Sequence, residues 1–324
     1  MKVSIIGTGA YGLALAINIS KNAKEICMWT ENEKKYLEWK ETKNLKSILD
    51  IKLPKNIKVS ENYEEVLKDS KLIIIACASK YVDMVCRDMK KYYNKSIPIC
   101  IATKGIEETT EDLLSNVVKN ILHTRNIAVI SGPTFAIDIA HDEAVALALG
   151  YTNKKTRDTV LKCLSTNRFK LRPTKDMLGI QLCGTIKNVI AIASGILAGL
   201  NYTESTRAFL INESLHDIKN IIRYLGGKPK TILSFAGIGD LMLTCSSTKS
   251  RNYSFGYIIG STKDPKKIKD YLSTTTVEGY FALDTIYKIL QFKNINIPLI
   301  NLIYDIVYNE KDPNSLVDFL ITKK

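Results

Sequence analysis

Three glycines near the amino terminus have the spacing of a phosphate-binding turn. Gly7, Gly9 and Gly12 follow a short apolar run and open a second apolar segment. In such a turn the first glycine permits a tight bend, the second lets the backbone approach a pyrophosphate, and the third lets helix pack on strand, while amides at the helix start face the phosphates. The pattern predicts a dinucleotide site that includes Ala10 and Tyr11. A glycine turn without a ligand is the alternative that the pattern alone leaves open.

An acidic residue follows the next apolar run at the distance typical of ribose recognition. Glu31 lies beyond the glycine turn by close to the separation of about 20 residues at which a carboxylate accepts hydrogen bonds from the ribose hydroxyls. Its charge would repel a 2'-phosphate, and no neighbouring Arg supplies a bidentate fork. We therefore expect NAD as the preferred cofactor, with NADP possible because Lys34 and Lys35 are close. A solvated carboxylate at a helix start is the alternative for Glu31.

Lys187 is the side chain best suited to proton transfer. It stands near the start of a predicted apolar helix whose face at Ala191, Gly195 and Ala198 is small, so another backbone or a ligand could approach closely. Burial lowers the pKa of an ammonium towards the working pH, which suits a general acid that protonates an alkoxide. Lys104 ends a predicted buried strand, at the carboxyl edge where doubly wound sheets bind ligands.

The elements that must position these residues change in type halfway along the chain. Up to Pro173, short apolar strands alternate with helical patterns, as in a parallel sheet covered by helices on both faces. Strands are predicted at Lys2–Ile6, Glu25–Trp29, Ile57–Ser60, Leu72–Ala76, Ile97–Ala102, Ile127–Ser131 and Ala144–Gly150. Helical periodicity covers Tyr81–Tyr92 and Thr109–Leu122.

Beyond Pro173 the strand-like runs disappear and apolar residues recur with a helical period. The clearest predicted helices are Lys187–Leu200, Arg207–Tyr224, Thr276–Phe292 and Pro298–Val307. We therefore predict an α/β protein with a doubly wound Rossmann-type sheet domain over residues 1–176. An all-α C-terminal domain over residues 177–324 would carry substrate binding and catalysis.

Composition and charge exclude several classes of protein. The 324-residue chain is 45% hydrophobic and 24% charged, as in packed globular proteins. Its net charge of +13 favours anionic ligands, but the lysines are spread without the long basic run of a nucleic-acid arm. Apolar stretches such as Val189–Leu200 fall short of the roughly 20 residues of a membrane span. We expect no nucleic-acid partner and no membrane insertion.

Cysteine and histidine usage favours a reduced, metal-free protein. The seven cysteines are odd in number and lack a CxxC pair, which fits thiols in the cytoplasm. His123, His141 and His216 do not stand at metal-ligand spacing from another His or Cys, so we expect no metal. Met1 to Ile6 runs directly into the glycine turn and leaves no room for a signal peptide.

Five segments taken together resemble one family. Besides the glycine turn they are Thr103-Lys104-Gly105, Ser131-Gly132-Pro133-Thr134-Phe135-Ala136, Cys183-Gly184-Thr185-Ile186-Lys187-Asn188-Val189, and the stretch from Gly237-Ile238-Gly239-Asp240 to Ser250-Arg251-Asn252. In this order the chain resembles the bacterial NAD(P)-dependent glycerol-3-phosphate dehydrogenases from Gly7 to Glu278. The resemblance implies an oxidoreductase that converts dihydroxyacetone phosphate to sn-glycerol 3-phosphate for phospholipid synthesis. It also implies a homodimer joined through helical domains.

The resemblance assigns roles to individual residues. Lys187 would exchange the proton, Asp240 would orient it, and Lys104 would contact both substrate and nicotinamide. Because an opposite charge favours the ammonium form, Asp240 would raise the pKa that burial lowers. Gly132 and Thr134 match substrate-binding positions.

The late segments match a phosphate clamp and further cofactor positions. Arg251 presents paired donors to two phosphate oxygens and would also reach the cofactor, Asn252 adds a directional donor, and Ser250 would add a hydroxyl. The remaining matches to cofactor positions are Ala136, Thr276 and Glu278. Helix-start character explains the last two equally well.

The chain departs from the family in three places, and two other functions compete. Cys77-Ala78-Ser79 stands where the family commonly has Val-Pro-Ser, which leaves that loop less rigid, and Ala10 stands where the family commonly has Ser in the glycine turn. Thr30-Glu31 stands where many relatives carry Arg or His. A hydroxyacid or ketopantoate reductase would share the architecture, but its carboxylate substrate would not require a clamp at Arg251. A module that senses NAD/NADH and binds nucleic acid or lipid headgroups would need no proton donor.

Overall fold

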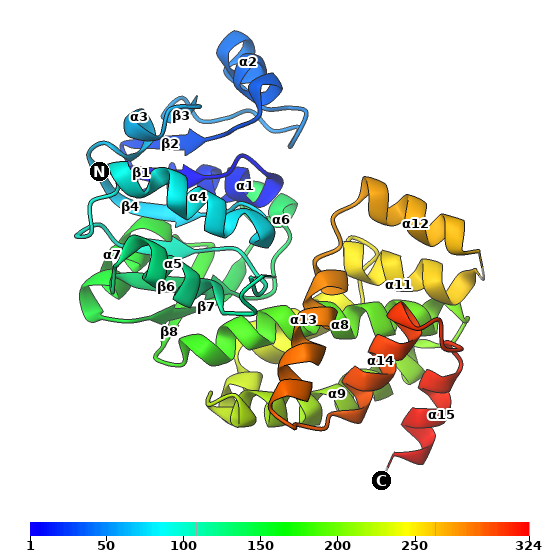
Figure 1. Cartoon of the computed structure of the whole chain (residues 1–324). Coiled ribbons are helices and arrows are strands. Elements are labelled where there is room, and N and C mark those ends of the chain that lie inside the picture. Colours follow the sequence, from blue (N-terminus) through cyan, green and yellow to red (C-terminus); the bar gives the residue numbers. More distant parts are fainter. Residues whose placement is uncertain (108, 263, 324) are drawn as a thin grey trace. The chain divides into compact units, whose positions relative to one another are not determined.

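The structure is a computed structural model that describes residues 1–107, 109–262 and 264–323 (Figure 1). The chain divides into two compact units. The first comprises Met1–Glu107 and Asp112–Met177, and the second comprises Leu178–Lys324 with the short segment Glu108–Glu111. The first unit holds the sheet, and the second is helical.

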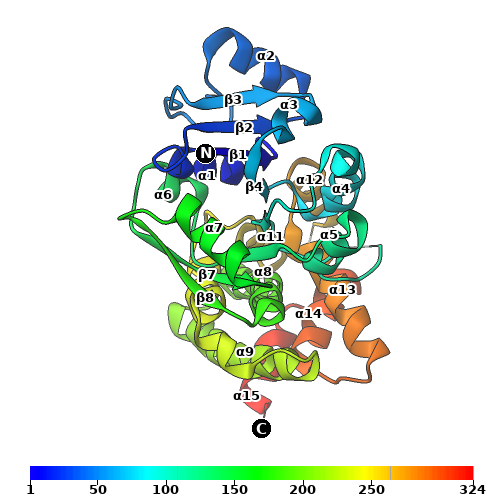
Figure 2. The ribbon, with the colours of Figure 1, turned by 90° about the vertical axis from the view of Figure 1, so that its left-hand side faces the viewer.

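Within the described ranges, the strands of the first unit form an eight-stranded sheet in the order β3-β2-β1-β4-β5-β6-β7-β8 (Figures 1 and 2). They are β1 (Lys2–Ile6), β2 (Glu25–Trp29), β3 (Ile57–Ser60), β4 (Ser70–Ile75), β5 (Ile99–Ile101), β6 (Ile127–Ser131), β7 (Val145–Tyr151) and β8 (Phe169–Thr174). Neighbouring strands from β3 to β6 are parallel. β1 and β4 are buried over most of their length, as expected of central strands covered on both faces. The strand order reverses between them, and ligands of such sheets bind at that point.

The far side of the sheet departs from the parallel pattern. β7 runs antiparallel to β6. The connecting helix α6 (Ala136–Ala140) has five residues and rises only about 7.5 Å, too little to carry the chain back along the sheet. β8, which is not among the strands that we predicted, pairs with β7 in parallel. Buried and exposed residues alternate from Phe169 to Arg172, as in an edge strand, and an edge strand also tolerates Pro173.

The helices of the first unit follow the prediction less closely than the strands. They are α1 (Ala10–Ile19), α2 (Glu33–Thr42), α3 (Tyr63–Leu67), α4 (Val82–Met89), α5 (Leu114–Leu122), α6 and α7 (Lys154–Leu164). The helix expected at 81–92 is divided, because 3-10 turns at Ser79–Tyr81 and Lys90–Tyr92 flank α4. The helix expected from Thr109 begins at Leu114, since Leu113 pairs with Ile106 in a short antiparallel bridge that requires extended backbone.

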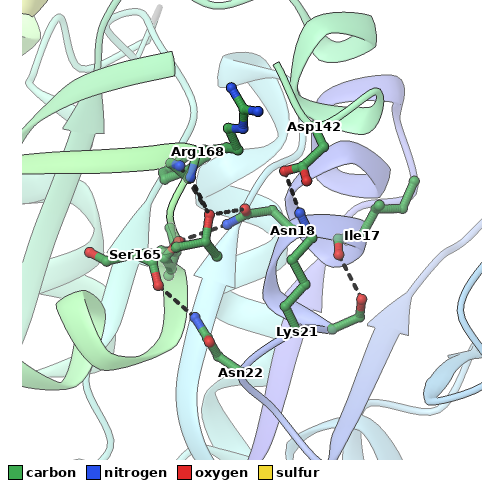
Figure 3. A network of polar contacts seen from close by, with 11 residues as sticks. Ile17, Asn18, Lys21, Asn22, Asp142, Ser165 and Arg168 are labelled. Atoms are coloured by element: carbon green, nitrogen blue, oxygen red, sulfur yellow. Dashed lines mark hydrogen bonds and ion pairs between the residues drawn. The ribbon is translucent and has the colours of Figure 1, made fainter. Parts of the chain in front are cut away.

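A network of polar contacts holds the carboxyl end of α1 (Figure 3). Asn18 Nδ2 donates to the carbonyl of the last residue of α7 at 2.7 Å, and Asn22 Nδ2 donates to Ser165 O at 2.8 Å. Lys21 forms an ion pair with Asp142, which precedes β7. Helix ends leave backbone carbonyls without intrahelical partners, and these side chains satisfy some of them. The bonds therefore fix α1 from the end opposite to the glycine turn.

The second unit consists of helices. They are α8 (Met177–Gly199), α9 (Glu204–Tyr224), α10 (Asp240–Cys245), α11 (Arg251–Ser261), α12 (Pro265–Thr274), α13 (Glu278–Phe292), α14 (Pro298–Tyr308) and α15 (Ser315–Thr322). A 3-10 turn at Pro229–Leu233 and a kinked turn at Phe235–Gly239 precede α10.

α8 is the core helix of this unit and corrects two expectations. It begins at Met177, so Lys187 lies in its middle and not near its start. The helix contains glycines, whose intrinsic helix propensity is poor. Burial of the segment from Gly179 to Leu197 stabilises the helix nonetheless. By length and composition α8 could cross a membrane. The expectation that the apolar stretches are too short for a membrane span was therefore wrong. However, 94% of its most apolar window is buried inside the structure, as in the core helix of a globular protein.

α8 and α11 pack backbone against backbone through glycines. An ideal Cβ at Gly195 or Gly199 would lie 2.0 or 2.3 Å from a carbonyl oxygen of α11. One at Gly256 or Gly260 of α11 would lie 1.9 or 2.2 Å from a carbonyl oxygen of α8. The small face predicted around Gly195 therefore receives another backbone.

Candidate active site

The glycine turn of the first unit has the geometry of a phosphate cradle. Gly7 has φ +118°, and a Cβ at Gly12 would lie 2.5 Å from Gly7 O, so α1 packs closely on the turn. A Cβ at Gly9 would meet no described atom within 4 Å, and no described side chain caps the amides of α1, whose first residues are Ala10 and Tyr11. Open space in front of helix amides is what a pyrophosphate requires. The residues present therefore fit a dinucleotide.

Hydrogen bonds tie the glycine turn to the segment that carries Glu31. Thr8 Oγ1 donates to Thr30 Oγ1 at 2.9 Å, and Thr30 Oγ1 accepts from Asn32 N at 3.2 Å. Asn32 Oδ1 in turn caps α2 by accepting from Lys35 N at 3.1 Å. Glu31 itself is exposed and lies two residues after Trp29, the last residue of β2. The backbone on either side of this carboxylate is thus held, while the carboxylate reaches solvent.

Lys104 and the loop after β6 lie together in the same unit. Lys104 follows β5 in a loop and does not end the strand as predicted, because the strand ends at Ile101. Thr103, which lies between the end of the strand and Lys104, donates from Oγ1 to Cys77 O at 2.7 Å. Lys104 Nζ donates to Gly132 O at 3.1 Å, which brings two predicted substrate residues into contact.

Two buried hydroxyls, one at the end of β6 and one in the loop that follows, lack a hydrogen-bond partner in the described part of the chain. Within the described residues, Ser131 Oγ and Thr134 Oγ1 are buried without a hydrogen-bond partner. A buried polar group without a partner costs about 1–3 kcal/mol, so the arrangement fits a ligand that supplies the missing bond. Thr134 was a predicted site residue, and Ser131 was not. Ala136, a predicted cofactor residue, begins α6.

In the second unit, Lys187 is buried in a cluster of polar side chains. Lys187 is 6% exposed and Asp240 is 1% exposed. Lys187 Nζ donates to Asp240 Oδ1 at 2.7 Å and to Thr244 Oγ1 at 2.6 Å. Because Thr244 Oγ1 donates its own proton to Asp240 O at 2.7 Å, its oxygen can accept from the ammonium. The three side chains therefore fix the position of Nζ.

Contacts between α8 and α10 hold this cluster together. Ser194 Oγ of α8 donates to Cys245 O, at the end of α10, at 2.7 Å. Cys245 lies beside the Lys187–Asp240 pair, and burial, ahead of the opposed effects of Lys187 and Asp240, raises the pKa of its thiol to about 12. The thiol therefore stays protonated and does not compete as an acid or nucleophile.

A second cluster adjoins Lys187 along α8. Asn188 Nδ2 lies 3.5 Å from Glu278 Oε2, and Asn252 Oδ1 accepts from Gly279 N at 2.8 Å. A Cβ at Gly279 would lie 2.6 Å from Asn188 O, so the start of α13 packs directly on α8. Asn252 and Glu278, both predicted positions, thus gather at the start of α13 around Asn188, the residue after Lys187 on α8. Sequence reasoning did not select Asn188.

The remaining predicted residues lie at helix starts. Ser250 caps α11, because its Oγ accepts from Tyr253 N at 3.3 Å. Arg251 is the first residue of α11 and is exposed, and Thr276 is exposed just before α13.

Metal-binding groups do not gather anywhere in the described ranges, where no set of three or more His, Cys, Asp or Glu could hold an ion.

Known proteins resemble this chain along its whole length. Residues 2–157 match the model of the NAD-dependent glycerol-3-phosphate dehydrogenase N-terminus, and residues 176–318 match that of its C-terminus. A glycerol-3-phosphate dehydrogenase (NAD(P)+) from Thermoanaerobacter sp. (strain X514) is 31% identical over 323 residues, covering 100% of this chain and 97% of the relative. One from Vesicomyosocius okutanii is 33% identical over 324 residues and covers 99% and 97%.

A solved structure agrees with these sequences. The crystal structure of glycerol-3-phosphate dehydrogenase from Coxiella burnetii has 29% sequence identity and a TM-score of 0.93, and the match covers 99% of each chain. The α/β sheet unit and the helical unit are thus those of a known dehydrogenase fold. The chain belongs to the family of NAD-dependent glycerol-3-phosphate dehydrogenases.

Proposed function

We propose that this protein interconverts dihydroxyacetone phosphate and sn-glycerol 3-phosphate with NAD(P)H and feeds glycerophospholipid synthesis. Membership of the family supports the reaction. The observation that carries the proposal is the buried ammonium of Lys187, held by Asp240 and Thr244. A proton donor fixed in this way suits the reduction of a ketone.

In this proposal Lys187 moves the proton of the reaction. The reduced nicotinamide, when bound, supplies the hydride that reduces carbon 2. Lys187 gives a proton from Nζ to the ketone oxygen and takes it back in the reverse direction. Asp240 and Thr244 keep Nζ in place by the bonds of 2.7 and 2.6 Å and stabilise its charged form.

The substrate phosphate would be held by the start of α11. Arg251 presents two parallel N–H groups to phosphate oxygens, and Ser250 adds a hydroxyl. The Oδ1 of Asn252 already accepts from Gly279 N, so its donation to the phosphate would come from Nδ2. Lys104, Gly132 and Thr134 would complete the substrate site.

Residues 1–176 would act as the dinucleotide-binding domain and residues 177–324 as the substrate-binding and catalytic domain. The open space at Gly9 in front of the amides of α1 supports pyrophosphate binding there. The other residues assigned to the cofactor are Gly7, Ala10, Tyr11, Gly12, Glu31, Lys104, Ala136, Arg251, Thr276 and Glu278.

NAD is the preferred cofactor in this proposal. The exposed carboxylate of Glu31 would accept from the ribose hydroxyls and repel a 2'-phosphate. Steady-state kinetics with both cofactors test this, with kcat/KM higher for NADH than for NADPH. In Glu31→Gln the ratio should move towards NADPH, whereas Glu33→Gln, a matched change on α2, should leave it unchanged. A wild-type preference for NADPH would contradict the assignment.

The reaction itself is tested by NADH oxidation with dihydroxyacetone phosphate against 2-oxo acids. Turnover of the phosphate ketone alone is expected, since the 2-oxo acids lack the phosphate that Arg251 would bind. Turnover of the acids alone would identify a hydroxyacid or ketopantoate reductase. Salt-dependent DNA binding without turnover of any keto-phosphate would favour a redox-sensing module.

We also propose that the enzyme works in the cytoplasm as a homodimer joined through its helical unit. Family resemblance supports the dimer, and burial of six of the seven cysteines fits thiols in a reducing compartment. Light scattering from the purified protein tests the assembly. A mass near 36.3 kDa at micromolar concentration would contradict a dimer.

A further inference from the structure

A cavity of about 860 Å³ lies in the first unit at a distance from the glycine turn. It is bordered by Met1 before β1, by the starts of β4 and β5, and by one face of α7. Met1 and Gly7 stand at opposite ends of β1, whose five residues span about 17 Å. The cavity is therefore separate from the pyrophosphate cradle. Its volume lies within the range of about 300–1,000 Å³ that small-molecule sites occupy.

Four lysines among the described residues line this cavity. Lys68 lies in the turn before β4 and Lys71 is the second residue of β4, while Lys155 and Lys162 lie on the same face of α7. Within the part of the chain that the structure describes, none of the four forms an ion pair. The cavity therefore holds an excess of positive charge, because four ammonium groups border it together with the two carboxylates of Asp69 and Asp158.

Some of the groups that would repel an anion at this place, namely two backbone carbonyls and one of the two carboxylates, are already engaged. Lys2 Nζ donates to the carbonyl oxygens of Glu65 and Lys68, at 2.7 and 2.8 Å, in the turn before β4. The carboxylate of Asp158, one of two in the lining, accepts from Arg157 Nε at 2.7 Å. These contacts leave the ammonium groups as the dominant charges of the cavity.

The lining also offers neutral donors and apolar surface. Asn94 Oδ1 accepts from both the amide and the hydroxyl of Ser96, at 3.0 and 2.9 Å. The group that Asn94 can present to a ligand is therefore its Nδ2 donor. Leu67, Tyr92 and Pro98 add apolar surface to the same cavity.

We infer that this cavity binds a small phosphorylated metabolite with at least two phosphate groups. The lysines come from two separate elements, the start of β4 with the turn before it and α7, so a ligand with a phosphate at each end could contact both pairs. An exposed ion pair contributes at most about 1 kcal/mol, so several charges on one ligand are needed for useful affinity. The inference does not depend on the proposed reaction.

Calorimetric titration with inorganic pyrophosphate and tripolyphosphate tests this site. The protein is first saturated with NADH, which occupies the glycine turn, and ionic strength is held constant. We expect saturable binding of one equivalent, and the same binding in Arg251→Ala. The double variant K155A/K162A should raise Kd at least about tenfold, the equivalent of about 1.4 kcal/mol. The matched double variant K266A/K267A removes the same charge from α12 and should change Kd less than about twofold.

Each contrary result overturns the inference in a recognisable way. An equal loss of binding in both double variants would show a general charge effect without a site. Loss of binding in Arg251→Ala, or no binding after saturation with NADH, would assign the polyphosphate to the active site. Citrate binding as tightly as tripolyphosphate would contradict phosphate recognition. NADH oxidation by both double variants should keep the wild-type kcat, which shows that they are folded.

Discussion

The two clusters of site residues are built by opposite means. Around Gly7, Gly9 and Gly12 the backbone itself forms the surface, because side chains are missing where a pyrophosphate would approach. Around Lys187, three buried polar side chains satisfy one another. The glycine turn should therefore lose cofactor binding when a side-chain atom is added. The cluster around Lys187 should lose activity when a polar group is removed.

The largest expected effect is removal of the ammonium. Lys187→Ala should lower kcat by about a hundredfold or more, because loss of a positioned acid costs about that much, while the Kd for NADH stays nearly unchanged. Steady-state kinetics and fluorescence titration of NADH measure the two. Lys219→Ala, an exposed lysine on α9, is the control. Normal turnover by Lys187→Ala would remove Lys187 from the mechanism.

Lys187→Ala also tests how much the buried Lys187–Asp240 ion pair contributes to the stability of the fold. Asp240 is 1% exposed and would lose its cationic partner, and breaking a buried pair typically costs about 3–5 kcal/mol. The free energy of unfolding, measured with urea, should fall by about that amount. Lys187→Ala/Asp240→Asn should recover part of the stability but none of the turnover.

Addition of a methyl group to the glycine turn is the next largest effect. Gly9→Ala should raise the Kd for NADH about thirtyfold, because a Cβ there would displace the pyrophosphate from amide donors, and bonds to charged groups contribute about 1.5–3 kcal/mol. Its melting temperature should match the wild type, since that Cβ meets no described atom within 4 Å. Gly12→Ala should lower both binding and stability. Unchanged NADH affinity in Gly9→Ala would contradict the cradle.

The phosphate clamp predicts a smaller change of a different kind. Arg251→Ala should raise KM for dihydroxyacetone phosphate about tenfold by loss of a charge-assisted bond, with kcat changed much less. Lys267→Ala, which removes an exposed charge from α12, should leave KM unchanged. An unaltered KM in Arg251→Ala would exclude the clamp.

The smallest effect concerns the hydroxyl that bridges Lys187 and Asp240. Thr244→Val keeps the volume of the side chain and should lower kcat about fivefold, in line with about 1 kcal/mol for one hydrogen bond. Thr244→Ser should restore the wild-type rate, which separates a bonding role from a packing role. Equal rates in the valine and serine variants would contradict the role of the hydroxyl.

The family and the fold class were predicted correctly from the sequence, because both depend on local patterns in chain order. Strands such as β1, β2, β3 and β6 were predicted at their observed bounds, and three of them, β1, β2 and β6, are mostly buried and rich in apolar residues. β8 was missed because Lys170 and Arg172 interrupt its apolar residues, so no continuous apolar run marks it in the sequence. A strand at the edge of a sheet tolerates a proline such as Pro173, because fewer of its backbone amides donate to a neighbouring strand. Whether a strand lies at an edge depends on its neighbours in the sheet, which the sequence does not show.

The site was predictable in its residue types and less so in its contacts. Thr244 stands four residues after Asp240, a spacing that places both on one face of α10, and this signal could have identified it. Asn188 adjoins Lys187 but contacts Glu278 across 90 residues, and no local pattern indicates that pairing. The orphaned hydroxyl of Ser131 was equally out of reach, because burial of a single side chain depends on tertiary packing.

The glycine contact between α8 and α11 limits how this enzyme can vary. Side chains in an ordinary core adjust to a change of volume by adopting other rotamers, but a helix axis in contact with another backbone has no such freedom. One additional methyl group at Gly195, Gly199, Gly256 or Gly260 would push the two helices apart. α11 carries Arg251 and Asn252, and α8 carries Lys187. Substitution of any of these four glycines would therefore displace the residues to which we assign substrate binding and proton transfer.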